Sequence, residues 1–190
     1  MREEETLAAP FGEAEMSLLV LLDEVPPNGF EIDYKAEADV LQALAGRLNV
    51  EEVADLHFQA LLLPLDKQCL QANGTVRGRV KQICGVTLEP LWTDIKKNFY
   101  TEFQPQESVA KYIVPEDDFD TELPEAMQNG QADVGEMVTQ VFAMEIPDYP
   151  RVEGAEFGGY GQSEAEVEAE DVEQSPFAAL SALKPSDGQA

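Results

Sequence analysis

The sequence predicts an α+β fold, in which an antiparallel β-meander is packed by two or three helices and flanked by acidic disordered tails. Two segments predict the sheet. Residues 75–83 and 91–103 alternate between apolar and polar side chains, as strands with one buried and one solvated face do. A further observation predicts helices, because apolar residues recur at intervals of three and four over residues 35–48 and 133–145.

The centre of the predicted meander is the segment 71–103. Its Asn73-Gly74 pair is typical of a two-residue hairpin turn, because both residues tolerate a positive φ. After that turn, Val76, Gly78, Val80 and Gln82 are expected on one face of a strand, and Arg77, Arg79 and Lys81 on the other. In the next strand, Leu91, Thr93, Ile95, Lys97, Phe99 and Phe103 share the apolar face, and Trp92, Asp94, Lys96, Asn98, Tyr100 and Glu102 share the polar face.

The other elements follow from local patterns. Residues 16–22 are a continuous apolar run, which predicts a buried strand rather than a helix because turn residues follow at 26–29. Residues 30–34 predict a short strand, 35–48 the first helix, and 53–65 a strand in which His57 is a packed or half-exposed side chain. Residues 133–145 predict the second helix, with Asp133 as N-cap and Glu136 three positions later. Met137, Phe142 and Met144 on this helix are expected in the core.

These elements define a single α+β domain at 16–152, with an acidic loop at 104–131. A flexible acidic N-terminus at 1–15, an acidic disordered linker at 153–174 and a tail at 185–190 complete the chain. The acidic loop lacks the residue spacing of a calcium-binding loop, so we expect it to be solvated. Residues 175–184 predict a short helix with Pro176 at its first position. Such a helix is marginal alone, so we expect it to dock, either on its own domain or on a partner.

Charge is distributed very unevenly along the chain, whose formal net charge is −26. Residues 67–111 hold seven basic and four acidic residues, a local charge of +3, whereas the rest holds five basic and 34 acidic residues, or −29. The basic residues of the meander therefore stand out, since phosphate binding depends on Lys and Arg. Arg77, Arg79, Lys81 and Lys96, with Trp92 and Tyr100, are candidates for contacting single-stranded RNA through phosphate contacts and base stacking. The alternative is a solvated face whose cations pair with Asp94 and Glu102 across the strands.

Several chemistries are not predicted. One histidine, no glycine-rich phosphate loop and no nucleophile motif argue against an enzyme, so we expect no cofactor and no small-molecule substrate. Cys69 and Cys84 are the only cysteines, too few for a zinc site alone, and we expect no bound metal. No apolar run has the length of a membrane span, and the acidic start lacks the features of a signal peptide. We therefore expect a cytoplasmic protein that does not contact a membrane.

Three separated motifs carry a resemblance. They are Cys84 with Leu88, Glu89 and Pro90 between two strands; Asp133, Gly135 and Glu136 at a helix start; and Pro176, Phe177 and Leu180 near the end. The chain resembles the YceD-like family, the large ribosomal RNA subunit accumulation proteins of bacteria and plastids. The stretch 43–48, Ala-Leu-Ala-Gly-Arg-Leu, also resembles a family pattern. This resemblance implies a non-enzymatic factor of ribosome biogenesis that supports accumulation or processing of 23S ribosomal RNA, with ribosomal RNA or a pre-ribosomal particle as partner.

The bend at 84–90 has two interpretations. Many family members carry a second cysteine where this chain has Thr87, which suggests a position that binds metal or contacts RNA. The other interpretation is a tight turn in which Cys84 is a small buried apolar group.

A second function also remains open. A chain this acidic could shield a basic ribosomal protein before assembly, with residues 115–125 and 164–173 as the binding segments.

Overall fold

The computed structural model describes residues 14–112 and 123–156. The chain divides into two units, 1–152 and 153–190. All helices and strands given below belong to the first unit. The acidic linker and the predicted helix at 175–184 lie outside the described residues, apart from residues 153–156 at the linker's start.

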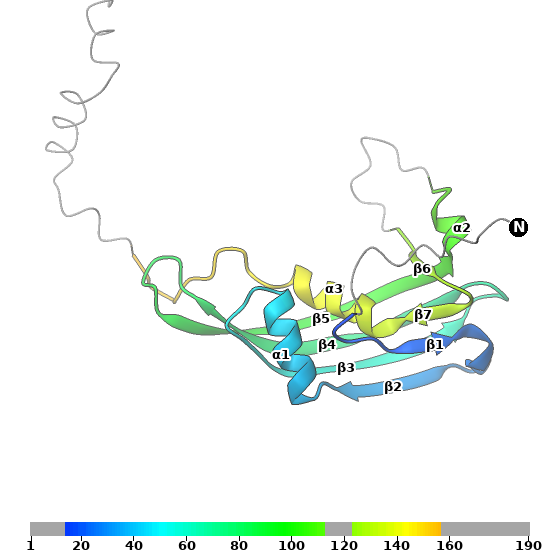
Figure 1. Ribbon diagram of the computed structural model, residues 1–190, viewed down its shortest axis with the longest axis horizontal. Coiled ribbons are helices and arrows are strands. Elements are labelled where there is room, and N and C mark those ends of the chain that lie inside the picture. Colours follow the sequence, from blue (N-terminus) through cyan, green and yellow to red (C-terminus); the bar gives the residue numbers. More distant parts are fainter. Residues whose placement is uncertain (1–13, 113–122, 157–190) are drawn as a thin grey trace, which may run out of the picture. The chain divides into compact units, whose positions relative to one another are not determined.

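A five-stranded sheet with strand order β2-β3-β4-β5-β6 forms the body of the first unit (Figure 1). The strands are β2 (Phe30–Lys35), β3 (Glu52–Pro64), β4 (Leu70–Ile83), β5 (Pro90–Pro105) and β6 (Glu125–Met127). Neighbours from β2 to β5 are antiparallel, whereas β6 runs parallel to β5. The antiparallel meander is thus confirmed over four strands, and β6 makes the sheet mixed.

Helices cover one side of this sheet. They are α1 (Ala38–Arg47) and α3 (Val134–Met144), and Figure 1 shows both on the same face, which we call the inner face. A two-stranded sheet of β1 (Leu19–Leu21) and β7 (Gln131–Asp133) leads into α3, and the short helix α2 (Gln106–Val109) follows β5. The described fold is therefore α+β, as the sequence predicts.

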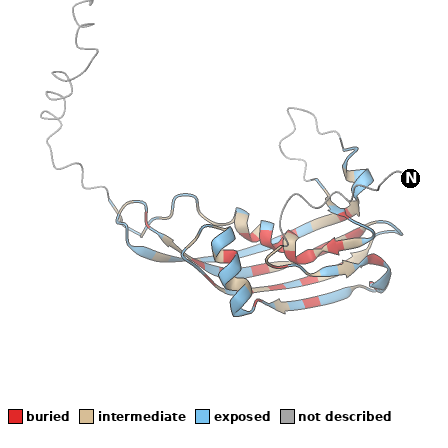
Figure 2. Ribbon diagram, viewed as in Figure 1, coloured by how far each residue is buried: buried red, intermediate tan, exposed pale blue. Residues whose placement is uncertain are grey.

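The core lies between the inner face and the two helices, where the buried residues gather (Figure 2). Along β4, Val76, Gly78 and Val80 are buried while Arg77 and Arg79 are exposed, so the predicted alternation is confirmed. Gly78 lies directly under the ring of Phe142 on α3, because a Cβ at this position would come within 2.9 Å of the ring. The strand therefore uses glycine where the helix approaches most closely.

The predicted hairpin turn at Asn73-Gly74 is wrong. Both residues lie inside β4, opposite Leu61 and Ala60 of β3. Gly74 is needed for close packing instead, because a Cβ would collide with the carbonyl oxygen of Gln59 and lie 2.9 Å from the Phe99 ring.

The real connection between β3 and β4 is the segment 65–69. Its Asp66 carboxylate accepts the N–H groups of Gln68 and Cys69, each at 2.7 Å. Aspartate often stabilises a turn in this way, by accepting hydrogen bonds from the backbone N–H groups that follow it. Its presence in a sequence nevertheless indicates a turn less strongly than an Asn-Gly pair does.

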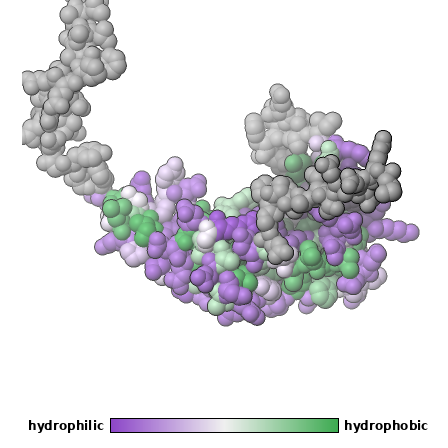
Figure 3. Space-filling view, in the orientation of Figure 1, coloured by the Kyte–Doolittle hydropathy of each residue, from purple (hydrophilic) through white to green (hydrophobic). Residues whose placement is uncertain are grey.

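The segment 16–22 is also corrected. Only Leu19–Leu21 forms a strand, and it pairs with β7 outside the main sheet, with Leu19 59% exposed. Met16 and Leu22 at the two ends of the run are buried. Figure 3 shows the apolar side chains that gather over β1 and β2 on this side of the molecule.

Two further expectations are wrong. The range 104–131, expected as a loop, contains the end of β5, α2 and β6, with 113–122 outside the described residues. Met144, expected in the core, is 77% exposed, because it lies beyond the buried stripe of α3, which runs through Val134, Met137, Val138 and Phe142. Lys97, on the predicted apolar face, pairs there with Glu145 just after α3, Nζ to Oε1 at 2.7 Å.

No helix in the described part of the chain is long and apolar enough to cross a membrane.

Candidate nucleic-acid interface

The other side of the sheet, which we call the outer face, carries a row of basic side chains. The strand registers place Lys35 opposite His57, His57 opposite Arg77, and Arg77 opposite Lys96. These four residues, the basic row, cross four strands at right angles to the chain direction. At about 4.8 Å between strands, the row spans roughly 14 Å.

His57 makes hydrogen bonds to two other side chains on the outer face, those of Arg77 and Asp33. Its Nδ1 accepts a hydrogen bond from Arg77 Nε at 3.1 Å, so Nε2 carries the proton and donates to Asp33 Oδ1 at 2.6 Å. The hydrogen bonds from His57 and then from Gln59 lower the pKa of the Asp33 carboxyl. The prediction of a packed histidine is confirmed, because the His57 side chain is 15% exposed.

A β-bulge shapes the next part of the outer face. The pairing of β3 with β4 shifts between Ala54 and His57, and Asp55 in the bulge has a φ of 54°. This backbone turns the Asp55 carboxylate onto Arg79, with Oδ2 2.7 Å from Nη2 and 3.1 Å from Nε. The Arg79 guanidinium also lies over the Trp92 ring, 5.1 Å from its centroid. Part of the basic charge on this face is therefore already neutralised.

The structure brings most of the predicted RNA-contacting residues together. Arg77, Arg79, Lys81, Lys96 and Trp92 lie on neighbouring positions of β4 and β5. Beside them is an open hollow of about 490 Å³, lined by Lys35, Asp55, His57, Arg77, Arg79 and Asp94 among others.

Tyr100 is separate from this group. It lies four residues farther along β5 than Lys96, and its hydroxyl donates to Glu102 at 2.8 Å. This hydrogen bond raises the pKa of Tyr100.

Two residues of the basic row, Lys35 and His57, were not predicted as site residues. They lie on strands distant in sequence from the basic cluster, so only the pairing register shows that they are neighbours. Lys35, expected at the start of the first helix, is instead the last residue of β2. The one available signal for its place on the polar face was that the alternation of 30–34 continues through it. Lys81 and Lys96 make no ion pair within residues 14–112 and 123–156.

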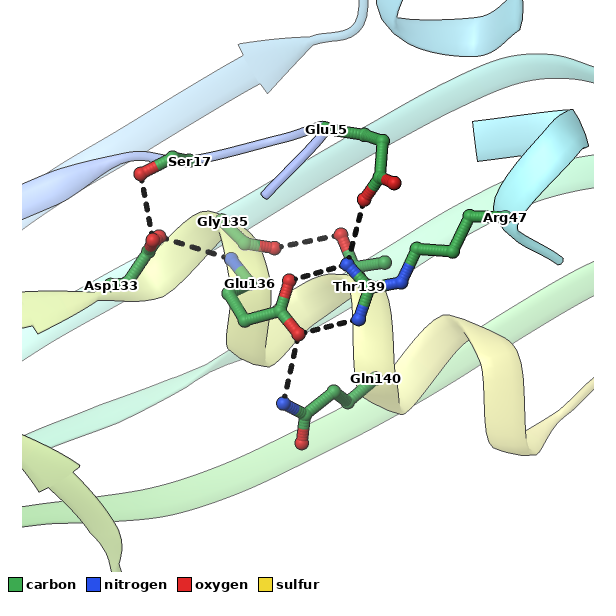
Figure 4. A network of polar contacts seen from close by, with 8 residues as sticks. All are labelled: Glu15, Ser17, Arg47, Asp133, Gly135, Glu136, Thr139 and Gln140. Carbon is green, nitrogen blue, oxygen red and sulfur yellow. Dashed lines mark hydrogen bonds and ion pairs between the residues drawn. The ribbon is translucent and has the colours of Figure 1, made fainter. Parts of the chain in front are cut away.

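The motif residues of the inner face form a different kind of cluster, shown in Figure 4. Arg47 at the end of α1 makes a two-pronged ion pair with Glu136 on α3, both contacts at 2.6 Å, and also reaches Glu15 at 2.9 Å. The hydrogen bonds that Arg47 donates to Glu136 and to Glu15 raise its own pKa. In return, the hydrogen bonds from Arg47 lower the pKa of Glu136.

Asp133 and Gly135 tie the N-terminal segment to the same helix. The Asp133 carboxylate accepts the Glu136 N–H at 3.1 Å, which confirms the predicted N-cap, and also accepts Ser17 Oγ at 2.7 Å and Leu18 N–H at 2.9 Å. A Cβ on Gly135 would lie 2.5 Å from the carbonyl oxygen of Met16. These motif residues therefore hold three segments together, and we call Arg47, Asp133, Gly135 and Glu136 the helix lock.

The bend between β4 and β5 wraps backbone N–H groups around one sulfur. Cys84 Sγ, fully buried, accepts from Thr87 at 3.3 Å and from Val86 and Val152 at 3.4 Å each. Hydrogen bonding by Thr87, and then by the Val152 and Val86 N–H groups, lowers the pKa of the Cys84 thiol to about 6. Among the residues the structure describes, no three His, Cys, Asp or Glu side chains are grouped to hold a metal.

Leu88, Glu89 and Pro90 complete the turn, with Leu88 at a φ of 60° and Glu89 accepting the Cys84 N–H at 2.8 Å.

The remaining motif residues, Pro176, Phe177 and Leu180, lie outside the described residues. The family model described as large ribosomal RNA subunit accumulation protein YceD matches residues 72–184. No curated protein and no solved structure shows a significant match to the chain. The matched range holds most of β4, the bend at Cys84, β5, α3 and the last motif, and it covers more than half of the chain. The chain therefore belongs to the YceD family of large ribosomal RNA subunit accumulation proteins.

Proposed function

We propose that this protein supports accumulation of large-subunit ribosomal RNA by contacting RNA directly through the outer face of its sheet. Family membership supports the general role, a part in large ribosomal RNA accumulation. The observation that carries direct contact is the basic row of Lys35, His57, Arg77 and Lys96.

The basic row is costly to a free protein. Like charges directly opposite each other on neighbouring strands destabilise a sheet, and Arg77 stands opposite Lys96 without an acid between them. The chain has 38 acidic residues, yet none of them stands opposite Arg77 on β5. An anion lying along the row removes the repulsion, because each phosphate adds a negative charge next to several positive groups.

Arg77 is prepared for this contact. Its Nε is held by His57, which fixes the plane of the guanidinium, while its two terminal nitrogens make no hydrogen bond to another described residue. A fixed guanidinium with free terminal N–H groups suits two-pronged binding of a phosphate. Trp92, on the neighbouring strand β5 and opposite Lys81, supplies an aromatic surface on which a base can stack.

Escort of a basic ribosomal protein remains the second candidate. The observation that favours it is the net charge of −26, together with Asp33, Asp55 and Asp94 among the cations of the outer face. Under this function the acidic segments make the contact, and the basic row plays no part.

The test is binding of single-stranded RNA across a series of salt concentrations. The variant Arg77→Ala/Lys96→Ala is compared with Lys67→Ala/Lys111→Ala, which removes the same charge from the 65–69 turn and from the second residue after α2. Loss of two phosphate contacts should lower the slope of log affinity against log salt by roughly 1.4 in the first variant. The control should keep the wild-type slope. Equal slopes in the two variants would end the proposal of direct contact, and retention of a basic ribosomal protein without RNA would favour escort.

A further inference from the structure

The edge of β5 is largely open. This strand runs over Pro90–Pro105, and β4 pairs with it on one side along almost its whole length. On the other side, β6 pairs only with residues 103–105. Within the described ranges, no other segment makes a backbone hydrogen bond to residues 91–102. A long open edge of this kind is a ready place for another strand to pair.

The register shows which backbone groups point to this open edge. Cys84 N donates to Glu89 O at 2.8 Å, so residue 89 directs its backbone groups toward β4. In an antiparallel pair, alternate residues bond to the same neighbour, so the odd-numbered residues of β5 face β4. The even-numbered ones therefore present free N–H and C=O groups to the edge: Trp92, Asp94, Lys96, Asn98, Tyr100 and Glu102. Pairing of β6 around Gln104, also even, agrees with this assignment.

The charges along the edge are self-complementary in one register. A second copy pairing antiparallel must set even residues opposite even residues, around a two-fold axis. With the axis at Ile95, Asp94 of each copy faces Lys96 of the other, which gives two opposite-charge pairs. With the axis at Lys96 or at Asp94, like charges face each other instead. An axis at Thr93 sets Trp92 opposite Asp94 and Pro90 opposite Lys96, so it forms no opposite-charge pair.

The position of β6 excludes the axes farther along β5. If the axis lies at Lys97 or later along β5, the Pro90 end of the second strand runs into the place that β6 occupies beside residues 103–105. With the axis at Ile95, Pro90 of one copy lies opposite Tyr100 of the other, so the second strand reaches its own bend at 84–89 before it meets β6. Trp92 then lies opposite Asn98.

We propose that two copies of this chain associate through the open edges of β5, antiparallel and centred on Ile95. The two five-stranded sheets then form one continuous sheet, and the two outer faces lie on the same side of it. This inference does not depend on RNA binding, because it follows from the backbone edge and from the Asp94 and Lys96 charges.

The first experiment is a charge exchange on the full chain, measured by sedimentation equilibrium. Wild type should form dimers. Asp94→Lys and Lys96→Asp should each raise the dimer dissociation constant by about tenfold or more, because each creates two like-charge pairs. The double variant Asp94→Lys/Lys96→Asp should restore dimers. A wild type that stays monomeric at about 100 µM, or a double variant no better than the single ones, would overturn the proposal.

The second experiment does not depend on the fold stability of charge variants. Asp94→Cys copies mixed with Lys96→Cys copies should form a disulfide between chains on mild oxidation, since residues in such a pair have Cα atoms about 5.5 Å apart. Each variant alone should form at least about tenfold less of the crosslinked dimer. Equal crosslinking in the mixture and in the separate samples would contradict the register.

Discussion

The two faces of the same sheet differ in how completely their charged residues are paired. On the inner side, the charged side chains of the helix lock meet in short, complete pairs, such as Arg47 with Glu136 at 2.6 Å on both prongs. On the outer face, Arg77 and Lys96 stand opposite each other with no acid between them. Charges that are paired within the chain stabilise the fold. Like charges opposite each other destabilise the sheet unless an anion binds beside them. The helix lock therefore belongs to the fold, and the basic row is the part of the sheet for which we propose RNA contact.

The largest effect is expected from Gly135→Ala. The added Cβ would lie 2.5 Å from Met16 O and 2.8 Å from Leu18 N, both backbone atoms that cannot move freely. We expect a loss of about 3 kcal/mol in the free energy of unfolding, measured in urea. Gly46→Ala on α1 is the matched control, because nothing lies within 4 Å of its added Cβ. It should stabilise by about 0.5–1 kcal/mol, and equal effects of the two changes would refute the assignment of Gly135.

Arg47→Ala should have the next largest effect. It removes a two-pronged pair whose side chains are only 32% and 25% exposed, and it leaves Glu136 without its partner. We expect a loss of about 1–2 kcal/mol in urea unfolding. Arg47→Lys should recover only part of the loss, because an ammonium cannot make both contacts. Full recovery by lysine would show that charge alone matters there.

The pH dependence of stability checks the same pair. Because Arg47 lowers the pKa of Glu136 below its usual 4.5, the pair stabilises the folded state above pH 4.5 and ceases to do so as the pH falls through the lowered value. The stability difference between wild type and Glu136→Gln should therefore be largest at pH 6 and should shrink toward pH 3. A difference that stays constant over this range would mean that the pair contributes nothing through its charge.

The smallest stability effect is expected on the outer face. Arg79→Ala breaks the pair with Asp55, whose side chains are 45% and 63% exposed, and should change the free energy of unfolding by less than about 0.5 kcal/mol. A loss comparable to that of Arg47→Ala would erase the contrast between the two faces.

Much of this contrast could be predicted from residue patterns. Alternation in 75–83 and 91–103 correctly separated the apolar from the polar side chains, because each strand has one buried face. The capping pattern at Asp133 and Glu136 located the start of α3. Both signals are local, and the forces behind them act within a few residues.

Long-range pairing could not be predicted in this way. Asn73-Gly74 has the local preference of a turn. Gly74 is instead needed because β3 and the Phe99 ring pack closely against it, and the neighbouring sequence does not indicate that contact. Lys35 and His57 join the basic row only through strand register. Arg47 meets Glu136 across 89 positions of sequence, so neither could be identified as half of a pair.

The most direct test of the account is ultraviolet crosslinking of the full chain in cells, with identification of both the RNA and the crosslinked peptide. The outer face of β4 and β5 carries Arg77, Lys96 and Trp92, so crosslinks should fall on peptides from these strands and on large-subunit ribosomal RNA. The Arg77→Ala/Lys96→Ala variant should lose most of them while Lys67→Ala/Lys111→Ala keeps them. Crosslinks confined to other segments, or their absence beside a copurifying basic ribosomal protein, would contradict the claim that the outer face binds RNA.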